Sequence, residues 1–192
     1  HPKQAHESYV LGTMHMICEE EFAIPQKVSN ALSHTKQLYL EMNAEDPSEQ
    51  AELAKIMAQA KPISSVLEKE QIKKLDSVLQ PILGFPVATL DQYGLMMLYN
   101  YAIMSSMPCQ KFKSYETELL ALVKNDKKEV KTFETAVQQM TVLNQTYSNQ
   151  ELYNLLLDIH SYKADFNQAT KHYLKEELEA CVNLIASDRY MS

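Results

Sequence analysis

Two short apolar runs without helical spacing predict strands near the start of the chain. The first run reads S-Y-V-L-G-T-M at residues 8–14, and the second reads Q-L-Y-L-E-M at residues 37–42. Residues 26–34 between them have helical spacing, and Pro25 suits the first turn of that helix. A strand, a helix and a strand in this order favour a parallel pair joined by one crossover. Residues 129–133 form a third and weaker strand candidate.

Apolar residues recur at steps of three and four along most of the remaining chain, which predicts helices. The helical segments are residues 48–59, 64–83, 91–104, 114–124, 135–143 and 149–185. Ser48 and Ser65 are candidate caps for the first two of these helices. We therefore expect one domain over residues 1–192 of the α/β (α+β) class, in which helix dominates. Its small, mainly parallel sheet would use residues of about 8–15, 37–42 and 129–134. A large helical insertion would span about 48–124, and long C-terminal helices about 149–186.

The composition changes this picture little, but the charge excludes some partners. Apolar residues make up 45% and charged residues 22% of the 192 residues, which is typical of a globular chain. Eighteen basic and twenty-five acidic residues give a net charge of −7, and Arg189 is the only arginine. Proteins that neutralise many phosphates usually carry a basic face rich in arginine. We expect no nucleic-acid partner.

The cysteines and the apolar runs give little information about the cellular compartment of the protein. Cys18, Cys109 and Cys181 are far apart and form no CxxC motif, so one bridge plus a free thiol and three free thiols both remain open. No apolar run approaches the length of a membrane-spanning helix, so no transmembrane segment is expected. The chain begins without Met or a signal sequence, which is typical of a mature or trimmed chain.

Polar side chains stand at the ends of the three predicted strands. His15 closes the sequence Gly12-Thr13-Met14-His15, Glu41 lies in the second run, and Glu134 follows the third. Ligands bind beyond the carboxyl ends of parallel strands, so these side chains are expected to meet. One imidazole and two carboxylates suit Zn²⁺, Mn²⁺ or Fe²⁺, and a metal with an open position activates water for hydrolysis.

A plainer interpretation stands beside this one. A histidine after a strand is commonly an ordinary core or loop residue, and carboxylates at strand ends are commonly solvated or ion-paired. The HExxH, HxH and GxSxG signatures of common hydrolases are absent from the sequence. Residue spacing alone leaves the function open.

Three segments carry a resemblance to a known family. S-Y-V-L-G-T-M-H at residues 8–15 and L-Y-L-E-M at residues 38–42 resemble the opening strands of the TraB/GumN family. The run F-E-T-A-V-Q-Q at residues 133–139 is similar to the family's L-E-T-x-x-x-Q segment, with Glu134 and Gln139 at the matching positions. The family is related to the TIKI metalloproteases and, more distantly, to haem-binding ChaN proteins and erythromycin esterases.

The resemblance implies a metal-dependent hydrolase, and a peptide-cleaving one. His15 and Glu41 would be catalytic residues and metal ligands, Glu134 a further ligand, and Gly12 and Gln139 neighbours of the site. The cofactor would be a divalent metal such as zinc, manganese or cobalt, and the substrate a peptide or a small molecule. The resemblance also implies a bacterial protein of the cell envelope or periplasm, with the cytoplasm as the alternative.

The sequence departs from the family near its end. The only GxxH motif begins at Gly12, and Arg189 is followed by Tyr190 where the family has an Arg-Asn pair. We therefore expect a fragment of a family member or a divergent short form with an incomplete metal site. Two alternatives follow, namely a non-catalytic ligand- or protein-binding domain with an apolar groove along residues 95–107, and haem binding in the manner of ChaN. A homodimer would allow a second chain to supply missing ligands.

Overall fold

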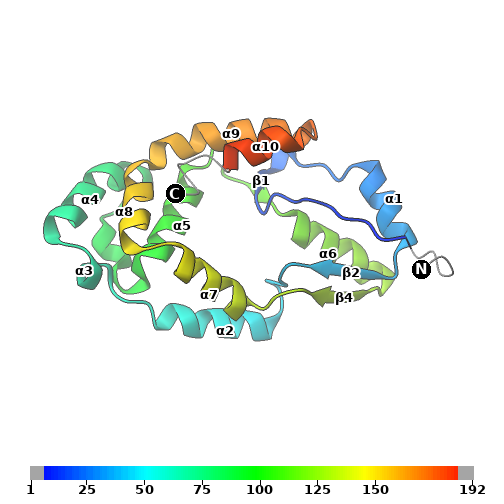
Figure 1. Cartoon of the computed structure of the whole chain (residues 1–192), viewed down its shortest axis with the longest axis horizontal. Coiled ribbons are helices and arrows are strands. Elements are labelled where there is room, and N and C mark those ends of the chain that lie inside the picture. Colours follow the sequence, from blue (N-terminus) through cyan, green and yellow to red (C-terminus); the bar gives the residue numbers. More distant parts are fainter. Residues whose placement is uncertain (1–6, 186–192) are drawn as a thin grey trace. The chain divides into compact units, whose positions relative to one another are not determined.

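The computed structural model describes residues 7–185, which divide into two compact units (Figure 1). Unit 1 combines residues 7–53 with 109–139, and unit 2 combines residues 54–108 with 140–185. The helices α2 (Pro47–Ala58) and α7 (Ala136–Thr146) each begin in unit 1 and end in unit 2. Helices dominate and one strand pair is parallel, so the predicted fold class is confirmed.

A parallel pair of strands forms the centre of unit 1. Strand β2 (Gln37–Leu40) pairs with β4 (Glu129–Thr132), and Leu40 lies opposite Thr132. Helix α1 (Gln26–His34) precedes β2, and helix α6 (Tyr115–Asp126) precedes β4 and packs against it. Alternation along β2 buries Leu40 and leaves Tyr39 exposed, as expected for a strand covered on one face.

The strand predicted over residues 8–15 is the main difference from the sequence-based prediction. Residues 7–14 form no strand, and the side chain of Val10 is fully exposed (100%). The strand in this part of the chain is β1 (Ile17–Cys18), which pairs in antiparallel fashion with β3 (Phe112–Lys113) and is followed by the short helix η1 (Glu19–Glu21). A strand needs a paired backbone as well as suitable side chains, so tertiary context overrode the local preference.

Helix α6 is held in place at its first turn. The Ser114 hydroxyl accepts a hydrogen bond from the backbone N–H of Thr117 (3.5 Å), which caps the helix. The next residue, Tyr115, is buried, and its ring centroid lies 4.8 Å from that of Phe22. Its hydroxyl donates to the carbonyl of Ala23 (2.9 Å), so the start of α6 is tied to the chain that follows β1.

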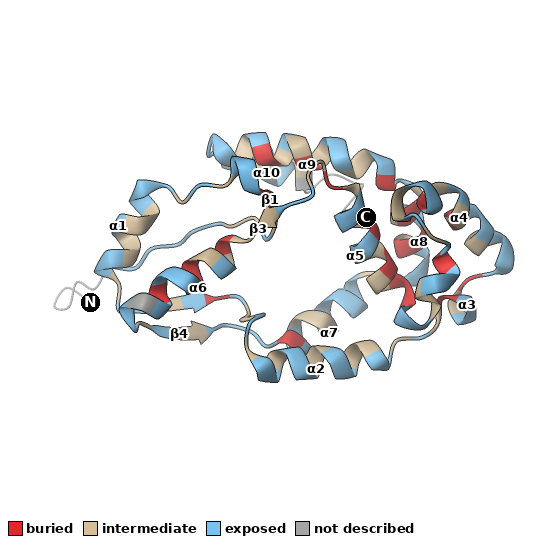
Figure 2. Ribbon diagram, turned by 180° about the vertical axis from the view of Figure 1, so that it is seen from behind, coloured by how far each residue is buried: buried red, intermediate tan, exposed pale blue. Residues whose placement is uncertain are grey.

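Unit 2 consists of helices that pack around the main hydrophobic core. Its elements are α3 (Ile63–Val66), α4 (Lys69–Leu83), η2 (Val87–Tyr93), α5 (Gly94–Ser106), α8 (Asn149–Leu157), α9 (Ile159–Leu174) and α10 (Leu178–Ile185). Buried residues gather on α4, α5 and α8 (Figure 2). Core members include Leu75, Leu79, Leu98, Ala102 and Leu156, each without exposed surface. The apolar helix predicted over residues 91–104 corresponds mainly to α5.

Two predicted helices are interrupted. The segment predicted over residues 64–83 breaks after α3, and Glu68 caps α4 through a capping box with Gln71. Ser65 lies inside α3 and Ser48 inside α2, so neither is the cap that the sequence predicted. The C-terminal segment divides at Asp158, which separates α8 from α9. Its predicted end at residue 186 lies outside the described residues.

Candidate functional site

The carboxyl ends of β2 and β4 bring two predicted site residues together along the backbone. Backbone N–H groups of Phe133 and Glu134 donate to the carbonyls of Leu40 and Glu41, each over 2.9 Å. The hydrogen bonding between the strands therefore continues beyond both strand ends. Glu41 and Glu134 consequently lie on neighbouring chains at one edge of the sheet.

His15 faces Glu41 from the irregular segment before β1. Its Nε2 atom lies 4.0 Å from Oε2 of Glu41, and the two side chains are 71% and 66% exposed. Among the described residues, the carboxylates within ion-pair distance of His15 belong to Glu41 and Glu116, and Glu134 is not one of them. The structure thus joins His15 to Glu41 by side-chain contact and leaves Glu134 adjacent through the backbone alone.

Glu116 is a site residue that the sequence-based prediction missed. Its Oε1 atom accepts from Nδ1 of His15 (3.1 Å) and from the hydroxyl of Thr13 (2.5 Å), while Oε2 accepts from the hydroxyl of Ser114 (2.6 Å). The side chain is only 19% exposed. A serine cap followed by an acidic residue marks a helix start, but that local signal says nothing about a histidine 101 positions away.

The hydrogen bonds around Glu116 set the charge states of the pair. Burial raises the pKa of Glu116, but the hydrogen bonds from His15, Ser114 and Thr13 outweigh it and lower the pKa to about 2. The hydrogen bond to Glu116 raises the pKa of His15, burial opposes this, and the charges of Glu116 and Glu41 add to the rise. At pH 6 the pair is therefore an imidazolium and a carboxylate.

This charged pair predicts a pH window for its contribution to stability. The raised pKa of His15 stabilises the fold below the ordinary value of 6.5, and the effect is lost as the pH rises through the raised pKa. The lowered pKa of Glu116 stabilises the fold above the ordinary value of 4.5, and the effect is lost as the pH falls toward about 2. Glu116→Gln should therefore cost about 1–2 kcal/mol between pH 4.5 and 6.5 and less on either side. Urea unfolding of both proteins across pH 3–9 measures this difference, and a cost independent of pH contradicts it.

A shallow, open pocket of about 570 Å³ lies next to His15 in unit 1. Acidic and basic groups both line it, and Lys113 forms an ion pair with Glu118 (2.8 Å). Its lining residues are His15, Met16, Glu19, Gln110, Lys111, Phe112, Lys113, Ser114, Thr117 and Glu118. The pocket therefore offers polar and apolar contacts to a ligand that reaches His15.

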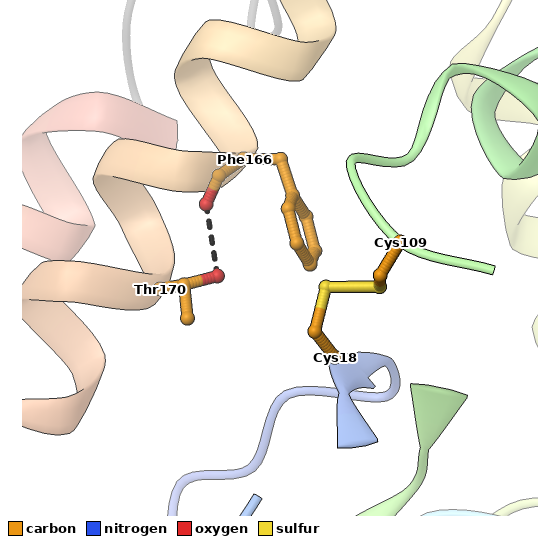
Figure 3. Close-up of a disulfide and its surroundings, with 4 residues drawn as sticks. All are labelled: Cys18, Cys109, Phe166 and Thr170. Carbon is orange, nitrogen blue, oxygen red and sulfur yellow. Dashed lines mark hydrogen bonds between the residues drawn. A yellow bond between two sulfur atoms is a disulfide. The ribbon is translucent and has the colours of Figure 1, made fainter. Parts of the chain in front are cut away.

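Figure 3 shows the disulfide between Cys18 and Cys109. It joins two chain segments whose neighbouring residues, Glu19 and Gln110, line this pocket. Cys18 ends β1, three residues after His15, and Cys109 precedes β3. The Cα atoms of the two cysteines are 5.9 Å apart, and 91 positions separate them in the sequence. Cys181 is a free cysteine, so the alternative of one bridge plus one thiol is the one observed.

The two predicted neighbours of the site occupy different settings. Gln139 lies in the first turn of α7, where its backbone N–H donates to the carbonyl of Thr135 (3.1 Å). Thr135 and Gln138 exchange reciprocal hydrogen bonds of 3.2 and 2.8 Å, which form a capping box directly after Glu134. Gly12 is exposed, and a Cβ atom built on it meets nothing within 4 Å.

Gly12 and Gly84 should respond differently to the same substitution. Gly84 ends α4 with a left-handed φ of 81°, whereas Gly12 does not have a left-handed φ and a Cβ atom built on it would meet no other atom within 4 Å. Gly84→Ala should cost about 1–2 kcal/mol, and Gly12→Ala should change stability by less than about 0.5 kcal/mol. Thermal unfolding of the two variants tests this contrast, and a larger loss in Gly12→Ala would show a backbone requirement there.

Residues 7–185 contain neither a cluster of three or more potential metal ligands nor a helix that could span a membrane. No group of three or more His, Cys, Asp or Glu side chains in this part of the chain is arranged to hold a metal ion. Among the same described residues, no helix is both long enough and apolar enough to cross a membrane. The candidate metal ligands that lie within 4.0 Å of each other are therefore the pair His15 and Glu41.

Comparison with known proteins identifies the family. The family model described as the TraB/PrgY/gumN family matches residues 2–191, which is almost the whole chain. The chain belongs to this family. No curated protein and no solved structure matches the chain at a significant level. The predicted resemblance is thus confirmed as family membership.

Proposed function

We propose that this chain is a metal-dependent hydrolase that cleaves peptides, with His15 and Glu41 at its centre. The observation that supports the proposal most is the 4.0 Å approach of His15 Nε2 to Glu41 Oε2 at the end of β2. Family membership supports it as well, because the matched region includes both residues. An exposed imidazole beside an exposed carboxylate at a strand end is a typical arrangement for a metal or a proton-transfer site.

The residues present fit a divalent metal. Imidazole nitrogen and carboxylate oxygen are the donors that zinc, manganese and cobalt accept, at about 2.0–2.2 Å for zinc. Nε2 of His15 and Oε2 of Glu41 are 4.0 Å apart, which is no more than twice the length of one zinc–ligand bond. A single ion between the two atoms would therefore reach both. Glu134, the third predicted ligand, adjoins Glu41 through the backbone, where its N–H donates to the carbonyl of Glu41. Remaining positions would be filled by water, by substrate or by donors from a second copy of the chain.

The chain's own groups have distinct tasks in this proposal. When bound, a divalent cation supplies polarisation of a carbonyl and activation of water. His15 would bind through Nε2, and Glu41 would bind through one carboxylate oxygen or accept the proton that water loses on attack. The pocket beside His15 would receive substrate, and Phe112 and Met16 give it apolar contacts.

A peptide-cleavage assay tests this function. The metal-free protein, reloaded separately with zinc, manganese or cobalt, is incubated with a mixed peptide library, and new termini are identified by mass spectrometry. Cleavage that needs metal and is lost in His15→Ala and Glu41→Gln supports the proposal. Cleavage that persists in His15→Ala would show that another site is responsible.

A non-catalytic binding domain is the second candidate. The observation in its favour is that, across residues 7–185, no cluster of three or more potential metal ligands occurs. This candidate predicts peptide binding without metal and without turnover. Fluorescence anisotropy of labelled peptides, with and without a chelator, separates it from the hydrolase.

We also propose a cell-envelope or periplasmic location. Disulfides form and persist in oxidising compartments and are rare in the cytosol. The bond between Cys18 and Cys109, buried at Cys18, is the support for this proposal. Alkylation of free thiols in intact cells before lysis tests it, because a cytoplasmic protein would be modified at all three cysteines.

A further inference from the structure

We propose that Glu116 is a positioning residue, which determines the ring nitrogen of His15 that is free to react. The inference goes beyond the proposed function, because it concerns the hydrogen atom on the imidazole and does not require a metal. It rests on the contacts of four residues in unit 1: Thr13, His15, Ser114 and Glu116.

The carboxylate of Glu116 is itself held in a fixed orientation. Thr13 donates to its Oε1 atom and Ser114 to its Oε2 atom, at 2.5 and 2.6 Å. Thr13 lies two residues before His15, and Ser114 caps α6, so the carboxylate connects the His15 segment to the start of a helix. The side chain of Glu116 is 19% exposed and that of His15 is 71% exposed. The fixed carboxylate is therefore largely buried, and the imidazole that would react is accessible to solvent.

The orientation of Glu116 determines where the imidazole carries its proton. An ionised carboxylate only accepts hydrogen bonds, so the ring atom 3.1 Å away, Nδ1, must be the donor. A neutral imidazole has one N–H, and the hydrogen bond to Glu116 keeps it on Nδ1. The lone pair then lies on Nε2, the nitrogen that faces Glu41.

The opposite tautomer is disfavoured by the same contacts. It would place the lone pair of Nδ1 against Oε1 of Glu116, an oxygen that already accepts a hydrogen bond from Thr13. Histidines that act as ligands or bases commonly donate their second nitrogen to a carboxylate for this reason. Glu116 would therefore act through His15, without contacting a substrate.

The test is a direct measurement of the His15 tautomer. Long-range proton–nitrogen correlation spectra of the ¹⁵N-labelled protein are recorded over a pH series that extends above the raised pKa of His15, and His15→Gln assigns the His15 signals. We expect the Nδ1–H tautomer in the wild type and a shift toward the Nε2–H tautomer in Glu116→Gln. Glu45→Gln is the matched control, because Glu45 is a carboxylate of unit 1 that pairs with Lys124 of α6 and does not line the pocket beside His15. A wild type with the Nε2–H tautomer, or an unchanged Glu116→Gln, overturns the proposal.

A second variant covers the case in which Glu116→Gln does not fold. Thr13→Val removes one donor to Glu116 and keeps the shape of the side chain, so a smaller shift in the same direction is expected. An unchanged tautomer in a folded Thr13→Val variant would then count against the positioning role.

Zinc affinity separates this inference from the proposed function. Equilibrium dialysis should show a 10–100-fold weaker zinc affinity in Glu116→Gln and an unchanged affinity in Glu45→Gln. If the wild type binds no zinc but the His15 tautomer shifts in Glu116→Gln, the proposed metal site is wrong and the positioning role of Glu116 is supported. If the wild type binds zinc and the tautomer does not respond, the positioning role is wrong.

Discussion

His15→Ala is expected to remove the stabilisation that a divalent metal confers on this protein. A ligand present at 100 times its Kd stabilises the folded state by about 2.7 kcal/mol. For a chain of this size that corresponds to a rise in melting temperature of about 5–10 °C. The variant loses the imidazole whose Nε2 faces Glu41, so the rise should disappear.

The measurement is a thermal-shift series on metal-free protein with zinc, manganese, cobalt and magnesium. His34→Ala is the matched control, because His34 is an exposed histidine of unit 1 whose Nδ1 contacts the carbonyl of Asn30 in its own helix. Glu41→Gln should reduce the rise as well. An equal rise in His15→Ala would place the metal elsewhere, and no rise in the wild type would favour the non-catalytic binding domain.

Loss of the disulfide between Cys18 and Cys109 is expected to be the most destabilising of the changes considered. The bond closes a loop across 91 sequence positions. In the chain-entropy account, a loop of that length corresponds to about 4–5 kcal/mol of stabilisation. A double Cys18→Ser, Cys109→Ser variant should therefore unfold at much lower urea concentration than the wild type.

Cys181→Ser is the control for this experiment, because Cys181 is the free cysteine of the chain. Thiol titration of the unfolded protein should find one free thiol in the wild type and none in Cys181→Ser. Equal stability of the double variant and the wild type would contradict the expected contribution. Since Cys18 follows His15 by three residues, the double variant should also weaken metal-induced stabilisation more than Cys181→Ser does.

Local patterns predicted the strands at β2 and β4 well. Strand β2 alternates in burial, whereas β4 has two half-buried residues between exposed ends, and the two strands pair in parallel. Polar residues at the strand ends are expected to meet, and Glu41 and Glu134 do lie on neighbouring chains at one edge of the sheet. This expectation did not predict that the side chain of His15 contacts Glu41 and Glu116 and not Glu134.

The segment at residues 8–14 shows the limit of local patterns. Its apolar residues suit a strand, yet strand formation depends on a neighbouring backbone, and the paired residues are Ile17 and Cys18. The start of α4 shows the same limit. Serine is a better cap than glutamate by residue type, yet Ser65 lies within α3 and Glu68 caps α4. Boundaries depend on which backbone groups find partners after the helices pack.

The amino-acid sequence alone was enough to establish the helix-dominated class with a small parallel sheet and the family, because these depend on short-range periodicity or on contiguous motifs. Tertiary structure decided that β2 pairs in parallel with β4 and not with residues 8–14. The pairing of Cys18 with Cys109 and the contact of Glu116 with His15 depend on tertiary structure, since they join residues 91 and 101 positions apart. Such contacts are selected by the packing of α6, β1 and β3, and no local pattern encodes which distant side chain completes them.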